Sequence, residues 1–257
     1  MQTKPFSFLL SCVAASIVLS GCGSDTTPNT DTNSTQPTSF VTAVNAVYQF
    51  PAEVKSALFA PNATLSQELK NTLSHMGNEE RLAFDIYNEL YEIYPQRQLY
   101  NIANNSESVH IQAVQFLVQK YIGDYSEFSN VDSTELAYKE TPISQMQTGV
   151  YDIQAIQDLY NTLYNKGKVS AKDALEVGCM VEVVDINDLT EYITLAEESD
   201  ADDIATVFGF LRQGSYQHYW AFDSALKTLG STDGCCSVGE EYCHPEYPQP
   251  TQGHGNH

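Results

Sequence analysis

The stretch Asn104–Tyr121, NNSESVHIQAVQFLVQKY, spaces its apolar side chains as they fall on one face of a helix. Glu107 and His110 lie within this apolar row, three residues apart, so they share one helix face. Burying a carboxylate or an imidazole is unfavourable unless the group finds a partner. The stretch therefore predicts a core helix that carries a pair of functional polar groups.

The same helical spacing recurs along the chain and predicts an all-α fold. A proline after the first stretch and a serine before the third mark helix ends. No stretch alternates with a period of two between turn signals, so we expect no sheet. The four long helices are predicted from Leu65 to Tyr94, from Leu99 to Ile122, from near Ser170 to Ala196, and from Asp200 to Leu229.

A long polar connection, 123–168, separates the second helix from the third and contains one short amphipathic piece, 153–167. Two helices, a long crossover and two more helices form the chain order of a four-helix bundle with one crossover. The sequence therefore predicts such a bundle over residues 45–230, with a short extra helix in the crossover.

Each predicted helix places a carboxylate or an imidazole on its inward side. Facing carboxylates repel one another unless cations or protons neutralise them. Carboxylate oxygens suit hard metal ions, and imidazole adds affinity for iron, manganese, zinc or copper. Taken singly, either histidine could be a hydrogen-bonded core residue and Glu80 a solvated flank residue. Taken as a set, the predicted metal ligands are Glu80, Glu107, His110, Glu182, Asp185 and His218.

Several segments together resemble one known family. They are NEERLAFDIYNELYEIY, NIANNSESVHIQAVQFLVQKYIG, DALEVGCMVEVVDINDL and FLRQGSYQHYWAF. The pattern is similar to the ferritin-like superfamily of carboxylate-bridged di-metal proteins, and more closely to its family named domain of unknown function 2202. The resemblance covers about residues 65–250.

The resemblance implies a role for each ligand, with Glu107 as the bridge between two metals. Tyr87 would donate a hydrogen bond or an electron, although core packing explains it equally well. The chain departs from the di-iron pattern at Ser215, where a second Glu-x-x-His would need a glutamate, and Asp185 could supply the missing oxygen. The remaining implied roles are Glu80 and Glu182 as terminal carboxylates and His110 and His218 as nitrogen donors.

Two functions follow as expectations. The first is a metal-binding protein that holds one or two ions, iron foremost with manganese, zinc or copper as alternatives, and that oxidises ferrous iron or reduces oxygen or peroxide. The second is a non-catalytic binding module of the cell envelope with one structural metal or none. The sequence assigns no catalytic residue and no protein partner.

The N-terminus resembles a bacterial lipoprotein signal. Lys4, an apolar run and Leu19-Ser20-Gly21 precede Cys22. The resemblance implies cleavage of residues 1–21, a lipid on Cys22 and attachment to the membrane in the bacterial cell envelope, at the outer membrane facing the periplasm or the surface. Residues 22–44 are rich in Thr, Ser, Asn and Pro and predict a flexible tether. A plain signal peptide is the alternative.

Charge and cysteine usage bound the remaining possibilities. The 257 residues carry 12 basic and 33 acidic side chains, a formal net charge of −21, which argues against a nucleic-acid partner. Cysteines in an exported tail, 231–257, favour disulfides. We expect a local bridge from Cys243 to Cys235 or Cys236, with a soft-metal site formed with the tail histidines as the alternative; these are His244, His254 and His257.

Overall fold

In the computed structural model of the chain, residues 50–122, 147–151 and 153–249 are described, and they form helices with no strand among them. The all-α prediction is confirmed for these residues. The predicted signal, the tether and most of the crossover lie outside them. The elements are α2 Ala52–Phe59, α3 Gln67–Ile93, α4 Arg97–Ile102, the π-helical turn η1 Ala103–Glu107, α5 Ser108–Ile122, α6 Gln154–Gly167, α7 Ala171–Glu198, α8 Asp202–Thr228, and the 3-10 turns η4 Gly234–Ser237 and η5 Glu240–Tyr242.

Local signals explain where the long helices begin and end. Ser66 caps α3 by accepting a hydrogen bond from the amide of Leu69, and Ser170 caps α7 in the same way with the amide of Asp173. Helix α3 ends at Ile93, just before Pro95, which cannot continue a helix. These ends agree with the predicted boundaries to within two residues.

Two features differ from the sequence-based expectation. Helix α2 lies in a region where we predict no helix; its buried Val54 and Leu58 pack on α8. The predicted single helix 99–122 starts earlier and consists of α4, η1 and α5 in succession. A π-helical turn places one extra residue in the turn, and nothing in the periodicity of apolar residues announces it.

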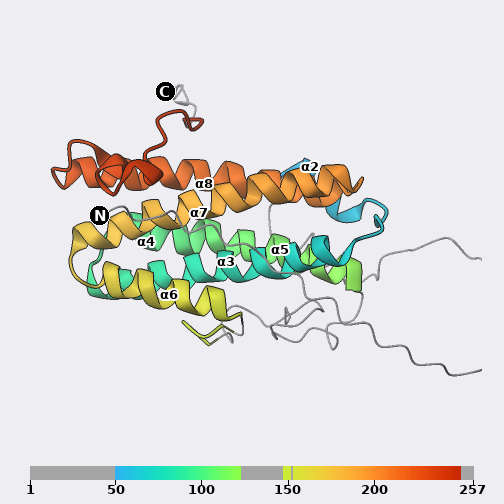
Figure 1. Cartoon of the computed structure of the whole chain (residues 1–257), viewed down its shortest axis with the longest axis horizontal. Coiled ribbons are helices and arrows are strands. Elements are labelled where there is room, and N and C mark those ends of the chain that lie inside the picture. The colour runs from blue at the N-terminus through green and yellow to red at the C-terminus, as the bar shows by residue number, and fades with distance from the viewer. Residues whose placement is uncertain (1–49, 123–146, 152, 250–257) are drawn as a thin grey trace, which may run out of the picture. The chain divides into compact units, whose positions relative to one another are not determined.

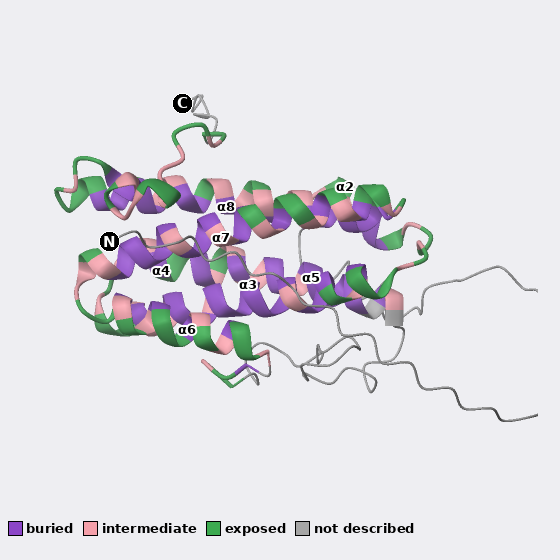
Figure 2. Cartoon of the chain, viewed as in Figure 1, coloured by how far each residue is buried: buried purple, intermediate pink, exposed green. Residues whose placement is uncertain are grey.

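The helices pack with their buried sides facing one another. Helix α7 lies along α8, α3 packs against α5, and α6 lies against both α3 and α7 (Figure 1). Buried residues follow the facing sides of these helices, and exposed residues follow their outer sides (Figure 2). None of the described helices is both long enough and apolar enough to cross a membrane.

The apolar core consists of two clusters that occupy different halves of the helices. The first includes Leu73 and Met76 of α3 and Leu211 of α8. The second includes Leu82 of α3 and Tyr219 of α8. Helices α3, α7 and α8 each contribute side chains to both clusters, and buried polar residues lie near the border between the clusters.

Two disulfides attach the C-terminal tail to the helices. Cys179 in α7 is bonded to Cys235 in η4, and Cys236 is bonded to Cys243. The structure thus selects Cys236 as the partner of Cys243, and it also uses Cys179, for which we predict no bridge. Tyr219 of α8 donates a hydrogen bond from its hydroxyl to the carbonyl of Tyr242, at 2.9 Å, and so holds the tail against that helix.

Candidate metal centre

A layer of buried polar side chains lies between the two apolar clusters. On α3 it falls between Met76 and Leu82, and on α8 between Leu211 and Tyr219. All six predicted ligands lie in this layer and each is at most 7% exposed; they are Glu80 of α3, Glu107 of η1, His110 of α5, Glu182 and Asp185 of α7, and His218 of α8.

Glu107 is shared between two histidines. Its Oε2 lies 3.0 Å from Nδ1 of His110, and its Oε1 lies 2.9 Å from Nδ1 of His218. The two imidazole rings face each other at an interplanar angle of 29°, with their centroids 5.6 Å apart. A carboxylate whose two oxygens face different nitrogen donors is arranged as a bridging ligand is.

Two groups of three potential ligands share Glu107. We call this pair of groups, which together have five residues, the inner pair. Glu80 and His110 complete one group, and Glu182 and His218 complete the other. Within each group the ligand atoms lie within 4.8 Å of one another. Metal–ligand bonds of about 2.0–2.2 Å hold the ligands of one ion at comparable separations. The inner pair therefore has donors and spacing for two ions.

Unpartnered atoms in the inner pair support this fit. Oε1 of Glu80 is buried and has no hydrogen-bond partner among the described residues. Nδ1 of His218 lies close to both neighbouring carboxylates but is not aligned for a hydrogen bond with either. Buried polar atoms are nearly always hydrogen-bonded, so these exceptions need a partner of another kind. A cation between the donors would supply it.

The charges of the layer also call for neutralisation. Burial, together with neighbouring carboxylates, raises the pKa of Glu80 well above its usual range. Burial raises the pKa of Glu182 to about 7, against the opposing effect of His218. Although burial favours the protonated form of Glu107, the two histidines hold its pKa well below the usual range. Without a cation, the folded layer therefore retains protons that carboxyl groups normally release.

Supporting residues fix the orientation of the donors. The Tyr87 hydroxyl donates a hydrogen bond of 2.6 Å to Oε1 of Glu182, which leaves Oε2 directed towards His218. Nε2 of His218 lies 2.7 Å from the hydroxyl of Ser106, so that nitrogen is engaged and Nδ1 faces the carboxylates. Outer partners of this kind fix the ring orientation of metal-binding histidines.

Two local features of the backbone make room for the donors. The π-helical turn η1 ends at Glu107 and leads directly into α5, which carries His110. Gly214 of α8 lies against the His110 ring, where a Cβ atom would come within 2.6 Å of Cε1 and Nε2. Only a glycine leaves this space, because real Cβ atoms do not approach ring atoms so closely.

Asp185 lies in the layer but in neither group of the inner pair. It accepts a short hydrogen bond from the Ser215 hydroxyl, while its Oδ1 has no partner among the described residues. Burial and the charges of Glu79 and Glu182 raise its pKa well above the usual range. Ser215 stands where the di-iron pattern needs a glutamate, and it contacts Asp185, the residue that could supply the missing carboxylate oxygen. In the structure, Asp185 lies next to the inner pair but in neither of its two groups.

A pocket opens beside the inner pair. Tyr242 of the tail contributes to its wall, and five carboxylates line it: Glu79, Glu80, Glu107, Glu182 and Asp185. The other side chains are mainly apolar and come from α3, α6 and α7: Leu82, Ala83, Leu159, Leu163, Met180, Val181 and Val184. A small molecule of low polarity could reach the carboxylates through such a pocket.

The structure also groups residues that we do not predict as ligands. His75, Glu79 and Asp188 form a third set with ligand atoms within 4.8 Å of one another, which we call the outer cluster. The i,i+4 spacing of His75 and Glu79 was visible in the sequence, but pairing them with Asp188 required the packing of α3 on α7. In the tail, His244 contacts Glu246 instead of a cysteine, and His254 and His257 lie outside the described residues.

Comparison with known proteins places this arrangement in a family. A protein of Methanocaldococcus jannaschii, described as uncharacterized protein MJ0754, is 34% identical over 171 residues, which cover 66% of this chain and 82% of that protein. The crystal structure described as hypothetical protein MJ0754 matches with a TM-score of 0.56 at 35% identity, over 67% of this chain and 87% of that one. Residues 69–240, which include the inner pair and the outer cluster, match a family model. The chain belongs to the family described as an uncharacterized protein domain, DUF2202.

Proposed function

We propose that the protein binds two transition-metal ions at the inner pair. The single observation that carries the proposal is Glu107, whose two oxygens face the Nδ1 atoms of two different histidines. Each histidine also faces one further carboxylate, from Glu80 or Glu182. This donor set, nitrogen with carboxylate oxygen, suits iron, manganese, zinc or copper, and the resemblance to carboxylate-bridged di-metal proteins favours iron.

The proposal includes a finer description of the fold. The long helical segments α3, α4–α5, α7 and α8 would be the four helices of a ferritin-like bundle, with α6 in its crossover. Ligands that project inwards from each of four helices, near their middles, are typical of that bundle. The position of the polar layer between two apolar clusters supports it.

The chemistry proposed for the inner pair is oxidation of ferrous iron or reduction of oxygen or peroxide. A bound pair of iron ions would supply the redox chemistry, because each ion can change reversibly between the ferrous and the ferric state. The chain's own residues bind and orient: Glu107 joins the two positions, and Tyr87 and Ser106 fix Glu182 and His218. The apolar side chains of the pocket, such as Leu159 and Met180, limit water near the carboxylates. In the metal-free protein, the raised pKa values of Glu80 and Glu182 let these carboxyls hold protons, which a bound ion would displace.

Iron content and oxidation rate test the proposal. Metal-free protein is loaded with ferrous iron without oxygen, passed through a desalting column and assayed for iron, and oxygen is then admitted. We expect about two tightly bound ions per chain in the wild type and none at the inner pair in Glu107→Ala. Glu176→Gln is the control, because Glu176 is a buried carboxylate of α7 that pairs with Lys166 and Lys172 instead. A wild-type protein that retains no transition metal would refute the proposal.

A second candidate is a non-catalytic module with one structural ion. Ser215 favours it, because this side chain binds Asp185 and supplies no carboxylate to the pair. The oxidation step of that experiment, together with a melting measurement, distinguishes the two functions. A module would melt at a higher temperature with metal while ferrous iron oxidised no faster than in buffer, whereas an oxidising centre would accelerate that reaction.

We further propose that the protein is anchored in the bacterial envelope. The support is the sequence alone: a signal-like segment, 1–21, that ends at Cys22, followed by a polar tether, 22–44. Cys22→Ala should release the protein from membrane fractions, and mass spectrometry of the wild type should find acyl chains on Cys22.

A further inference from the structure

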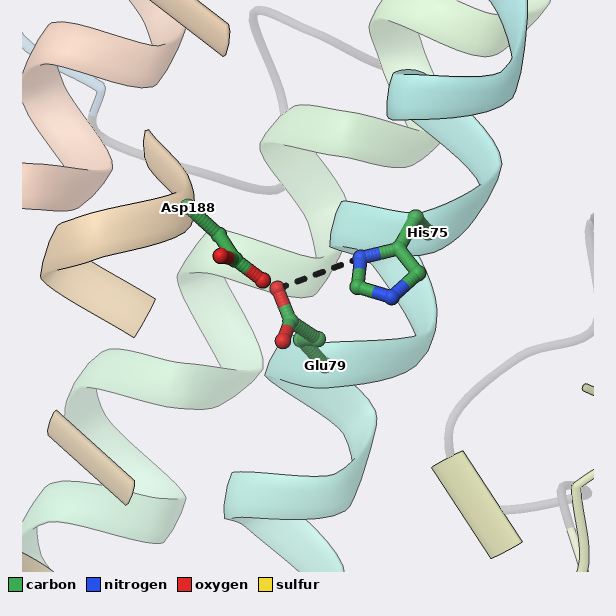
Figure 3. Close-up of side chains that lie close together, drawn as sticks. All are labelled: His75, Glu79 and Asp188. Atoms are coloured by element: carbon green, nitrogen blue, oxygen red, sulfur yellow. Dashed lines mark ion pairs between the residues drawn. The ribbon is translucent and has the colours of Figure 1, made fainter. Parts of the chain in front are cut away.

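The outer cluster joins α3 to α7 at the border of the polar layer. His75 and Glu79 lie one helical turn apart on α3, with Nδ1 of His75 3.4 Å from Oε2 of Glu79. Asp188 reaches them from α7, and Figure 3 shows its carboxylate and that of Glu79 pointing towards each other. One imidazole and two carboxylates thus converge from two helices.

Glu79 has a buried oxygen that lacks a donor. Its side chain is 7% exposed, and Oε2 has no hydrogen-bond partner among the described residues. This oxygen is the atom that points between Asp188 and His75 (Figure 3). A buried carboxylate oxygen without a donor is destabilising, and Asp188 could donate to it only while protonated. The atom therefore indicates a missing cation.

The electrostatics of the cluster agree with its geometry. Burial alone would lower the pKa of His75, but Glu79 and Asp188 outweigh it and raise that pKa to about 9. Burial, followed by the charge of Glu79, raises the pKa of Asp188 to about 8. In the absence of metal, protons thus take the place of a positive charge between these groups.

The cluster is separate from the inner pair but next to it. Glu79 directly precedes Glu80, and Asp188 lies one turn beyond Asp185, which itself lies one turn beyond Glu182. His75 and Asp188 are only partly buried, whereas every donor of the inner pair is buried. An ion held here would exchange more readily with solvent.

We propose that His75, Glu79 and Asp188 form a third cation site, which takes a first-row divalent ion such as Co²⁺, Zn²⁺, Mn²⁺ or Fe²⁺. The mixture of one nitrogen and two carboxylates selects this class over calcium or magnesium. The site binds more weakly than the inner pair, because the Tyr192 hydroxyl lies 3.1 Å from Nδ1 of His75 and that contact must give way. The site does not depend on the function proposed for the inner pair.

The test is the number of Co²⁺ ions that metal-free protein binds. Calorimetry and visible absorption both measure this number during a titration. We expect three ions in the wild type, two in the double variant His75→Ala/Asp188→Asn, and one in Glu107→Gln. His244→Ala is the control, because His244 also pairs with a carboxylate, Glu246, but in the tail. It should retain three.

The possible outcomes separate this proposal from the previous one. A double variant that binds as many ions as the wild type overturns the outer site. Loss of only the two tighter ions in Glu107→Gln supports both sites, and a wild type with a single ion, lost in the double variant, supports the outer site alone.

Tyr192→Phe covers the case in which the double variant fails to fold. It removes only the competing hydroxyl, so the outer site should bind Co²⁺ several-fold more tightly, while a purely structural cluster would show no change in Co²⁺ affinity.

Discussion

The inner pair and the outer cluster use the same side-chain types at different depths. Both combine imidazole with carboxylates from α3 and α7, but the inner pair adds donors from η1, α5 and α8. The inner donors have partners such as Tyr87 that orient them, whereas Tyr192 of the outer cluster contacts a donor nitrogen itself. If both sites bind ions, we expect burial and orientation of the donors, more than residue type, to decide which ion is retained and which exchanges with solvent.

Metal loading should give the largest effect, and the inner pair should contribute more of the stabilisation than the outer cluster. At free ion about 1,000-fold above Kd, one site stabilises the fold by about 4 kcal/mol, which is about 8–16 °C in Tm for a domain of this size. Glu107→Gln should abolish the inner contribution and leave a smaller shift from the outer cluster. Calorimetric melting with and without Zn²⁺ measures the Tm shift of the wild type and of the variant. Equal shifts in the two proteins would contradict the assignment of the main metal site to the inner pair.

The pH dependence of stability should reverse between metal-free and loaded protein. In the folded state, burial raises the pKa of Glu182 to about 7 and that of Asp188 to about 8, while unfolded carboxyls titrate near 4. The folded state therefore holds more protons than the unfolded state, and the metal-free protein gains stability as pH falls from about 8 to 5.

Bound metal competes with these protons, so loaded protein should lose stability over the same range. Urea titrations at pH 5, 6, 7 and 8, with chelator or with metal, give both slopes. Parallel slopes would show that the carboxylates do not bind the ion.

Substitution of Gly214 tests whether the position of a donor affects affinity at the inner pair, because it removes no ligand. In Gly214→Ala the new methyl group must displace the His110 ring, so affinity at the inner pair should fall by about tenfold or more. Gly209→Ala on the same helix is the matched control, because its Cβ would meet nothing within 4 Å. Competition with a chelating dye compares the two variants. Equal affinities would mean that the position of His110 does not matter.

Removal of one supporting hydroxyl should give the smallest effect. Tyr87→Phe leaves Oε1 of Glu182 without its donor, and we expect about tenfold weaker binding at the inner pair with the outer cluster unchanged. Tyr151→Phe is the control, because it removes a similar hydrogen bond, to Asp85, away from both sites. Dye competition again gives the answer, and an equal loss in both variants would indicate general destabilisation.

Much of the fold and of the inner pair could be predicted because the relevant signals are local. Ser66, Ser170 and Pro95 set helix ends through contacts within a few residues. Glu107 and His110 stand out because each interrupts an apolar row on its own helix. Such signals can be recognised in a single sequence, without knowing which segments pack against one another.

The features that were missed depend on contacts between distant segments. Helix α2 is short, and its apolar side packs on α8 and α5, which are distant in the sequence. The outer cluster needs Asp188 of α7 beside Glu79 of α3, and no spacing within a single helix predicts that contact. The bridge between Cys179 and Cys235 joins positions 56 residues apart, and sequence spacing cannot rank such pairings.

That bridge also limits how far the chain can spread when it unfolds. Cys179 lies within α7 and Cys235 follows α8, so the bond between them closes a loop that contains the turn between these two helices. A closed loop has fewer unfolded conformations than an open one, so less conformational entropy is lost when α8 packs on α7 again. Because the bond survives urea, we expect unreduced chains to refold faster than reduced ones.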